Sequence, residues 1–187
     1  QREKGNKKGK VVGGRSDIAT VYREMVEEMD KGIGEILATL RENGLTENTL
    51  VFFCSDNGAN RNGSNGSLKG HKGQIWEGGH RVPAIASWPG KIEAGTETDT
   101  TVLSMDLFPT MLDAAGIAAI PSLDGASLLP LMTGRKPLAE RTVFWAIGKG
   151  KDFAARRGPW KFVVSGGNDK GGQLYDLSKD IGEKIPA

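Results

Sequence analysis

One segment of the sequence constrains the fold more than any other, a continuous apolar run at residues 49–54 that stops at Ser55-Asp56-Asn57-Gly58. Branched and aromatic side chains fill this run, which is typical of a strand covered on both faces. We therefore expect an interior strand of a parallel sheet. The polar residues that follow would lie at its carboxyl end, the edge at which open α/β sheets bind ligands.

A long amphipathic helix is predicted before this strand. From residue 16 to residue 40, apolar side chains recur at three- and four-residue spacing, which places them on one helical face. Ser16 is a candidate N-cap, and Gly44 supplies a left-handed stop. Gly32 and Gly34 each weaken the helix interior by about 1 kcal/mol relative to alanine, so the helix depends on packing against a neighbour.

Further α/β elements are predicted after the strand. A polar, glycine-rich loop at residues 59–73 is long enough to be functional or disordered, and a second strand is expected at residues 82–88. Residues 106–116 predict a helix, with Pro109 in its first turn and Gly116 past its end.

The sequence pattern changes after Pro137, where short segments typical of strands alternate with glycine-rich turns. This pattern predicts an antiparallel meander. The pieces lie at residues 142–147, 153–156, 160–164 and 173–177. We therefore expect an α/β protein in three parts: a flexible basic arm at residues 1–15, an α/β portion at residues 16–135 and a small antiparallel β subdomain at residues 136–187.

Composition excludes several classes of protein. Hydrophobic residues make up 37% of the chain, which argues against disorder, and no apolar run approaches the roughly 18 to 20 residues of a membrane span. The net charge is only +2 and the excess lies in the first ten residues, so we expect no nucleic-acid partner. Cys54 is the only cysteine, lies within the apolar strand, and is interpreted as structural.

Asp56 and Asn57 are candidate metal ligands. Carboxylate and amide oxygens suit Ca²⁺ or Mg²⁺, whereas zinc favours histidine or cysteine, and the chain has only His71 and His80. Asp-Asn-Gly is also an ordinary turn sequence, so a turn without metal stays open as the alternative. Two residues cannot complete the shell of about six to eight oxygens that Ca²⁺ takes.

Residues 69–73 form a candidate anion site. A lysine set between glycines lets the backbone approach a ligand closely and presents an ammonium, a point charge suited to sulfate or phosphate. The alternative is a solvent-facing basic loop. His71 and His80 can contact substrate or carry protons near neutral pH, although each can equally be a structural or surface histidine.

An ordered set of sequence blocks resembles the carboxyl-terminal half of type I sulfatases, which belong to the alkaline-phosphatase superfamily. The resemblance covers nearly everything after residue 16. The blocks are residues 22–30, 50–58, 68–73, 76–84, 106–110 and 174–177.

This resemblance implies a fold and a set of site residues. The fold would be a partial alkaline-phosphatase-like α/β/α sandwich followed by a small antiparallel subdomain. Asp56 and Asn57 would be ligands of the catalytic Ca²⁺, with Mg²⁺ as the alternative ion. Lys72 would be catalytic and would contact the sulfate, and His71 and His80 join it as candidate substrate-binding residues.

The nucleophile of the family is missing from this sequence. Sulfatases use a formylglycine made from Cys or Ser in a Cys/Ser-x-Pro-x-Arg motif, and the chain contains no such motif. We therefore expect the carboxyl-terminal part of a sulfatase that is inactive alone. Its missing amino-terminal half would supply the formylglycine and the remaining metal ligands.

The resemblance also sets the expected partners and leaves alternatives open. The partners would be a sulfate-ester substrate, the missing half of the enzyme and, through an exposed sheet edge, a second copy of the chain. A periplasmic or secreted location follows from the family alone. A phosphoric or phosphonic ester hydrolase of the same superfamily and a noncatalytic module that binds an anion or a partner remain as rival functions.

Overall fold

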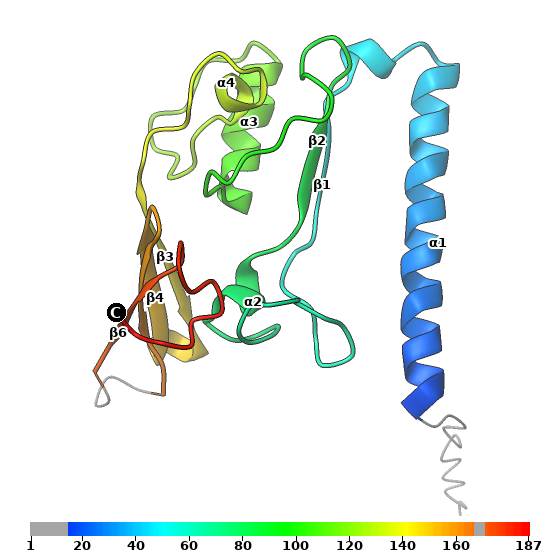
Figure 1. Cartoon of the computed structure of the whole chain (residues 1–187). Helices are drawn as coiled ribbons and strands as arrows, with labels where there is room; N and C mark the ends of the chain where they lie inside the picture. Colours follow the sequence, from blue (N-terminus) through cyan, green and yellow to red (C-terminus); the bar gives the residue numbers. More distant parts are fainter. Residues whose placement is uncertain (1–14, 167–170) are drawn as a thin grey trace, which may run out of the picture.

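The computed structural model describes residues 15–166 and 171–187. Apart from Arg15, the predicted basic arm lies outside these residues, as does the side chain of the proposed N-cap, Ser16. Figure 1 shows a long helix on one side, a central portion with strands and short helices, and a separate sheet at the carboxyl-terminal end.

The long helix α1 spans Arg15–Glu42, as the apolar periodicity predicts. Gly44 follows it with φ +66°, the left-handed conformation expected of a helix stop. The described residues leave most of its apolar face uncovered: Met25 is 67% exposed and Ile36 is 61% exposed. In Figure 1 the helix stands beside the strands of the central portion rather than packing along them. No helix in the described part of the chain is both long and apolar enough to cross a membrane.

The central strands form a two-stranded sheet. After a short 3-10 turn, η1 (Thr46–Asn48), β1 (Val51–Cys54) pairs with β2 (Ala84–Ser87). The pairing is antiparallel, with Val51 opposite Ser87. The prediction that β1 lies in a parallel sheet was therefore wrong within the described residues, where its partner β2 is antiparallel. An apolar run predicts that both faces of a strand are covered, but it does not set the direction of the neighbouring strand, which depends on where the chain returns. Within the described residues all four residues of β1 are only half-buried.

A buried carboxylate organises the helices that follow. Asp106 accepts hydrogen bonds from the backbone N–H of Leu103 at 2.8 Å and of Ala126 at 2.9 Å, and it pairs with the guanidinium of Arg141. Burial alone would raise the pKa of Asp106, but these donors hold it below its usual value. The helices are η2 (Ser104–Asp106), α3 (Leu107–Ala114) and α4 (Leu129–Met132).

The carboxyl-terminal sheet is the predicted antiparallel meander. Its strand order is β3-β4-β5-β6, and every neighbouring pair is antiparallel. Its inner face contributes Ala154, Val163 and Tyr175 to a core that also contains Ile75 from the central portion. The strands are β3 (Thr142–Ile147), β4 (Asp152–Arg157), β5 (Trp160–Val164) and β6 (Gln173–Asp176), with a 3-10 turn η3 (Gly148–Gly150) between the first two.

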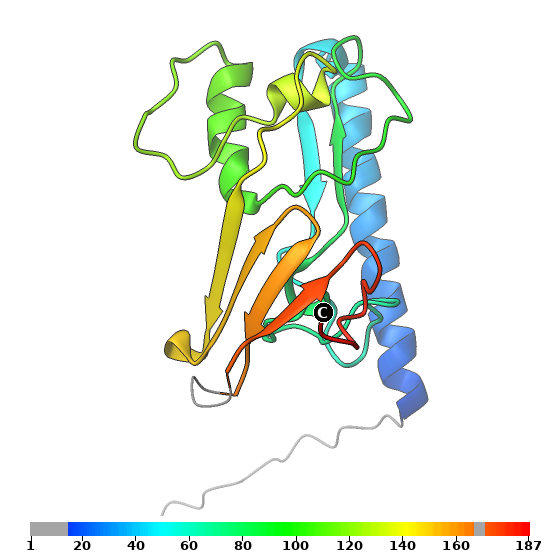
Figure 2. The same ribbon diagram turned by 60° about the vertical axis from the view of Figure 1, so that its left-hand side comes forward.

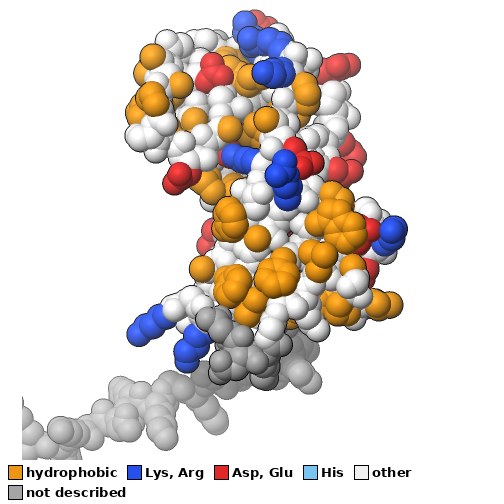
Figure 3. Space-filling view, turned by 90° about the vertical axis from the view of Figure 1, so that its left-hand side faces the viewer, with side chains coloured by type: hydrophobic (Ala, Val, Ile, Leu, Met, Phe, Trp, Pro, Cys, Tyr) orange, Lys and Arg blue, Asp and Glu red, His pale blue; other side chains and the backbone are white. Residues whose placement is uncertain are grey.

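The outer face of this sheet is also apolar. Phe144 is 70% exposed and Trp160 is 45% exposed, and the strand register places Phe162 and Leu174 on the same face. Figure 3 shows hydrophobic side chains gathered over this part of the molecule. The described residues therefore cover only the inner face of the sheet.

Close backbone packing joins the end of β1 to the short helix α2 (Glu77–His80). The Gly58 N–H donates to the Gly79 carbonyl oxygen at 3.0 Å. A β-carbon at Gly58 would lie 1.8 Å from the Gly78 carbonyl oxygen, and one at Gly79 would lie 1.9 Å from the Gln74 carbonyl oxygen. The two segments can approach this closely only because these positions lack side chains.

We expect the substitution Gly58→Ala to lower the free energy of unfolding of the intact protein by roughly 1 to 3 kcal/mol, because the new methyl group overlaps backbone that cannot move freely. Gly34→Ala is the matched control: Gly34 lies on the polar side of α1, nothing lies within 4 Å of its added β-carbon, and the change should stabilise the helix by up to about 1 kcal/mol. Urea unfolding of both variants measures the difference. Equal effects would contradict this account.

Candidate functional site

The residues that the sequence singled out all lie on the connection between β1 and β2. Asp56 and Asn57 follow the last residue of β1 almost directly, and Asp56 is exposed whereas Asn57 is half-buried. His71 and Lys72 lie at the far end of the polar loop, and His80 ends α2. In Figure 2 this connection lies between α1 and the carboxyl-terminal sheet.

The loop returns Lys72 to the neighbourhood of the Asp56-Asn57 turn. The Lys72 N–H donates to the carbonyl oxygen of Ala59 at 3.0 Å, and Ala59 is only two residues past Asn57. The side chain of Lys72 is exposed. Its ammonium therefore extends from backbone that is hydrogen-bonded beside the two candidate metal ligands.

His71 closes a tight turn next to Lys72. Its backbone N–H donates to the Gln74 side-chain oxygen at 3.0 Å, and the Gln74 N–H donates back to the His71 carbonyl oxygen at 3.0 Å. The ring Nδ1 lies 3.1 Å from the Lys72 carbonyl oxygen. His71 as a whole is half-buried, so part of the residue remains accessible.

Asn65, which the sequence did not single out, holds the loop together from inside. Its side-chain oxygen accepts the Ala59 N–H at 2.7 Å, and its amide group donates to the Gly70 carbonyl oxygen at 3.0 Å. One side chain thus joins the segment after Asn57 to the segment before His71. An asparagine among glycines and serines gives no local signal of such a bridge.

The candidate metal ligands supply only part of a coordination shell. Asp56 and Asn57 bring the hard oxygen atoms that Ca²⁺ and Mg²⁺ prefer. Within residues 15–166 and 171–187, no group of three or more His, Cys, Asp or Glu side chains is placed to hold a metal ion. The donor chemistry fits a hard cation, and the shell needs further ligands.

His80 lies in a different environment from His71. Only 18% of its side chain is exposed, and its ring stacks on Trp145 with centroids 4.3 Å apart. Its Nε2 lies 3.2 Å from both the Lys161 ammonium and the Ile75 carbonyl oxygen. Burial and the nearby Lys161 cation lower the pKa of His80 to about 4, so the ring is neutral near pH 7.

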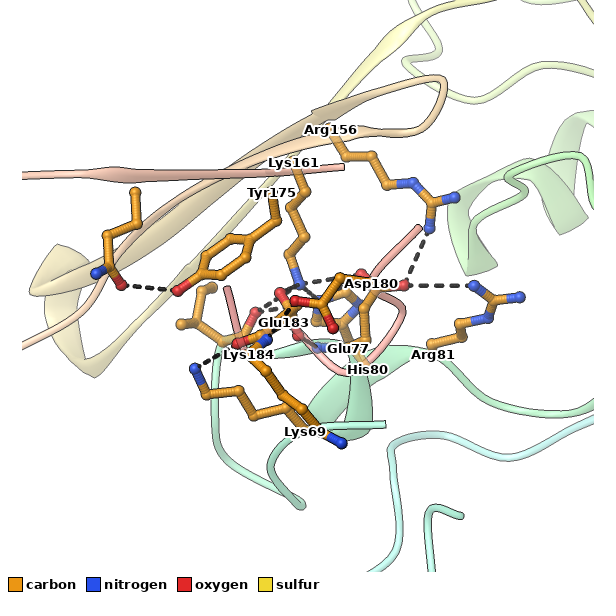
Figure 4. A network of polar contacts seen from close by, with 12 residues as sticks. Lys69, Glu77, His80, Arg81, Arg156, Lys161, Tyr175, Asp180, Glu183 and Lys184 are labelled. Carbon is orange, nitrogen blue, oxygen red and sulfur yellow. Dashed lines mark hydrogen bonds and ion pairs between the residues drawn. The ribbon is translucent and has the colours of Figure 1, made fainter. Parts of the chain in front are cut away.

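Next to His80 lies a buried charge cluster formed by Glu77, Lys161 and Glu183, all fully buried. The Lys161 ammonium lies 2.9 Å from a carboxylate oxygen of each glutamate. Arg156 adds a second cation, 3.0 Å from Glu77. Burial alone would raise the pKa of Glu77, but Lys161 and Arg156 hold it below its usual range. Figure 4 shows Lys161 reaching from the sheet toward both carboxylates.

This cluster joins α2 to the carboxyl-terminal sheet and to the segment that follows it, and the sequence did not predict it. The position of Lys161 in β5 gives a weak indication that its side chain is buried. Its neighbours Trp160 and Phe162 lie on the outer face of the sheet, whereas Lys161 lies on the inner face with Val163. Nothing in the sequence near Glu77 or Glu183 points to the other.

Two family models match this chain. A family model described as Sulfatase matches residues 2–117, and one described as N-sulphoglucosamine sulphohydrolase, C-terminal, matches residues 71–184. Steryl-sulfatase of Rattus norvegicus is 44% identical over 126 residues, which cover 60% of this chain and 22% of that protein. N-acetylgalactosamine-6-sulfatase of Canis lupus familiaris is 45% identical over 136 residues, 68% of this chain and 26% of that protein.

Solved structures show the same fold. Ps i-CgsB superposes with a TM-score of 0.84 at 29% identity, and the match covers 96% of this chain and 40% of the Ps i-CgsB chain. The PsFucS1 sulfatase from Pseudoalteromonas sp. gives a TM-score of 0.75 at 27% identity and covers 86% of this chain and 37% of its own. The chain therefore spans about a quarter of these two curated relatives and about two fifths of these solved structures.

The lowered pKa of His80 predicts a pH dependence of stability. An ordinary histidine has a pKa of 6.5, so between about pH 4 and 6.5 the unfolded chain binds a proton that the folded protein does not. The free energy of unfolding should therefore fall as the pH drops through this window, by roughly 3 kcal/mol in total, and His80 should contribute no loss above it.

Urea unfolding of the intact protein between about pH 4.5 and about pH 7 measures this slope. The variant His80→Gln cannot take up the proton, so its slope should be flatter than that of the unmodified protein. The two proteins share every other titrating group, including Glu77, which contributes only at lower pH because its ordinary pKa is 4.5. Identical slopes would show that His80 does not titrate in this way.

Proposed function

This chain belongs to the sulfatase family, and we propose that it is the carboxyl-terminal part of an enzyme that hydrolyses sulfate esters. The observation that carries the proposal is the loop geometry: the backbone of Lys72 is hydrogen-bonded to Ala59, beside the Asp56-Asn57 turn. A cationic amine and two hard oxygen donors at one edge suit a tetrahedral oxyanion held together with a metal ion.

We assign Asp56 and Asn57 as metal ligands. Ca²⁺ is the favoured ion and Mg²⁺ the alternative, because the donors are a carboxylate and an amide rather than imidazole or thiolate. When bound, the cation would supply positive charge to the sulfate oxygens. The remaining ligands, together with the formylglycine of the family, would come from the amino-terminal half of the enzyme.

Lys72 would stabilise negative charge on the sulfate group. Its exposed ammonium is a point charge that can approach the oxyanion without a fixed hydrogen-bonding plane. Charge stabilisation of this kind is effective in a water-poor pocket, and the missing half would have to close that pocket. His71, beside Lys72, is the second candidate substrate contact. His80 is the third candidate substrate contact, and it would meet the substrate as a neutral imidazole because its pKa is about 4.

The missing half would also cover apolar surface. The uncovered face of α1 and the open edges of the β1–β2 sheet expose groups that soluble proteins normally bury or pair. We propose that the amino-terminal half binds there. The isolated chain would then be inactive, and self-association through the sheet edge is the second use we propose for the same surface.

Lys72→Ala should lower kcat of the intact enzyme on an aryl sulfate by roughly 10² to 10³-fold, because a positive charge at the reacting group is lost. The free energy of unfolding should stay within about 0.5 kcal/mol, since the side chain is exposed. The isolated chain, which we expect to be inactive, gives the background rate for this assay.

Lys91→Ala, which removes another exposed lysine, is the matched control and should leave kcat unchanged. Aryl phosphate is assayed in parallel. Turnover that favours phosphate would support the phosphoric or phosphonic ester alternative, and unaltered turnover of Lys72→Ala would reject the role of this lysine. No hydrolysis of either ester by the intact protein would favour a noncatalytic binding module.

Asp56→Ala should weaken binding of Ca²⁺ by the intact enzyme severely, because a methyl group cannot replace an anionic oxygen ligand. Isothermal titration calorimetry with CaCl₂ on metal-free protein measures this directly, without relying on activity. Asp124→Ala, which removes an exposed carboxylate elsewhere, serves as the control and should retain the affinity of the unmodified enzyme. Undiminished affinity in Asp56→Ala would exclude Asp56 as a ligand.

A further inference from the structure

Glu183 holds both ends of the segment that carries Lys72. The Lys69 ammonium donates to the backbone carbonyl oxygen of Glu183 at 2.9 Å, and the Glu77 N–H donates to the Glu183 carboxylate at 2.7 Å. The Gly78 N–H donates to the Lys69 carbonyl oxygen at 2.7 Å, which brings the two ends together. The loop between Lys69 and Glu77 is therefore closed at its base by one residue near the carboxyl end of the chain.

Glu183 is itself held firmly. Its second carboxylate oxygen lies 2.9 Å from the buried ammonium of Lys161, which also donates to the Ile75 carbonyl oxygen at 3.2 Å. Figure 4 shows these groups converging from the sheet, from α2 and from the carboxyl-terminal segment. The closure therefore rests on a strand of the subdomain rather than on another loop.

The backbone at Glu183 is strained. Its φ is +49°, in the left-handed region that residues other than glycine seldom adopt, although its N–H is satisfied by the Asp180 carbonyl oxygen at 3.1 Å. Glycine would take this conformation without strain. Contacts of the buried carboxylate with Glu77 and Lys161 offset the cost of placing a glutamate here.

The other side of the loop is fixed independently. The Lys72 N–H is bonded to Ala59, near the candidate metal ligands, and Asn65 bridges Ala59 to Gly70. The place of Lys72 relative to the Asp56-Asn57 turn thus depends on two anchors, one in the central portion and one in the subdomain. Loosening the second anchor would let the loop shift without unfolding the first.

Resting on the proposed sulfatase function, we propose that Glu183 is a positioning residue, which through Lys69 and Glu77 fixes where Lys72 lies against the metal-binding turn. Glu183 would not touch substrate. A residue that serves only to attach the subdomain would affect stability alone, whereas a positioning residue also affects turnover by folded enzyme, since small displacements of a reacting group are costly.

The test compares Glu183→Gly and Glu183→Gln in the intact enzyme. Glu183→Gly removes the carboxylate and relieves the strained backbone, and it should lower kcat on an aryl sulfate by at least about tenfold with little change in KM. Glu183→Gln keeps an oxygen that can accept the Glu77 N–H, so it should recover part of the loss. Rates are expressed per folded molecule, from the unfolding curve of each variant.

Glu140→Gln is the matched control, because Glu140 forms an exposed ion pair with Arg157 in the same part of the chain. It should leave kcat unchanged. Hydrogen exchange adds a readout independent of activity: amides of residues 69–77 should exchange faster in Glu183→Gly, while those of β3 and β4 keep their protection.

The outcomes separate this proposal from the function on which it rests. Failure of the unmodified enzyme to hydrolyse the sulfate ester, or full activity of Lys72→Ala, would overturn the proposed function. An active enzyme that needs Lys72 but keeps its full kcat in Glu183→Gly would overturn the positioning role alone. Should Glu183→Gly fail to fold, undiminished kcat and unaltered exchange of residues 69–77 in Glu183→Gln would overturn it equally.

Discussion

The buried cluster of Lys161 with Glu77 and Glu183 is the interaction on which the arrangement of this chain depends. It joins β5, α2 and the carboxyl-terminal segment at a point that solvent does not reach. Buried charges are tolerated only when they are paired, and removing one partner typically costs about 3 to 5 kcal/mol. Arg156 pairs with Glu77 and so supplies a second positive charge for the two carboxylates. The cluster therefore holds the carboxyl-terminal sheet against the loop that carries the candidate site.

Close backbone packing complements this cluster. The contacts of Gly58 and Gly79 bring the end of β1 against α2 at distances that exclude any side chain, while the cluster holds α2 from its other side. The connection between β1 and β2 is thus held in place at Gly58 and at α2, and its exposed part carries Lys72. Ionic and steric constraints act here on the same short segment.

Much apolar surface is left uncovered by the described residues, on α1 and on the outer face of the carboxyl-terminal sheet. Chains of this size normally bury such surface. The sulfatases that this chain resembles are far longer, since the matched residues make up only 22% of rat steryl-sulfatase. Exposed surface and partial coverage are the observations behind the proposal that other parts of an enzyme complete the site.

The sequence by itself determined α1, α3, the four-stranded meander and the family, because helix and strand periodicities are local and the family blocks occur in a fixed order. Only the tertiary structure decided the antiparallel direction of β2, the neutral state of His80 and the meeting of Glu77 with Lys161 and Glu183. These features join residues far apart in the chain. Packing sets such contacts, and no pattern of neighbouring residues encodes them.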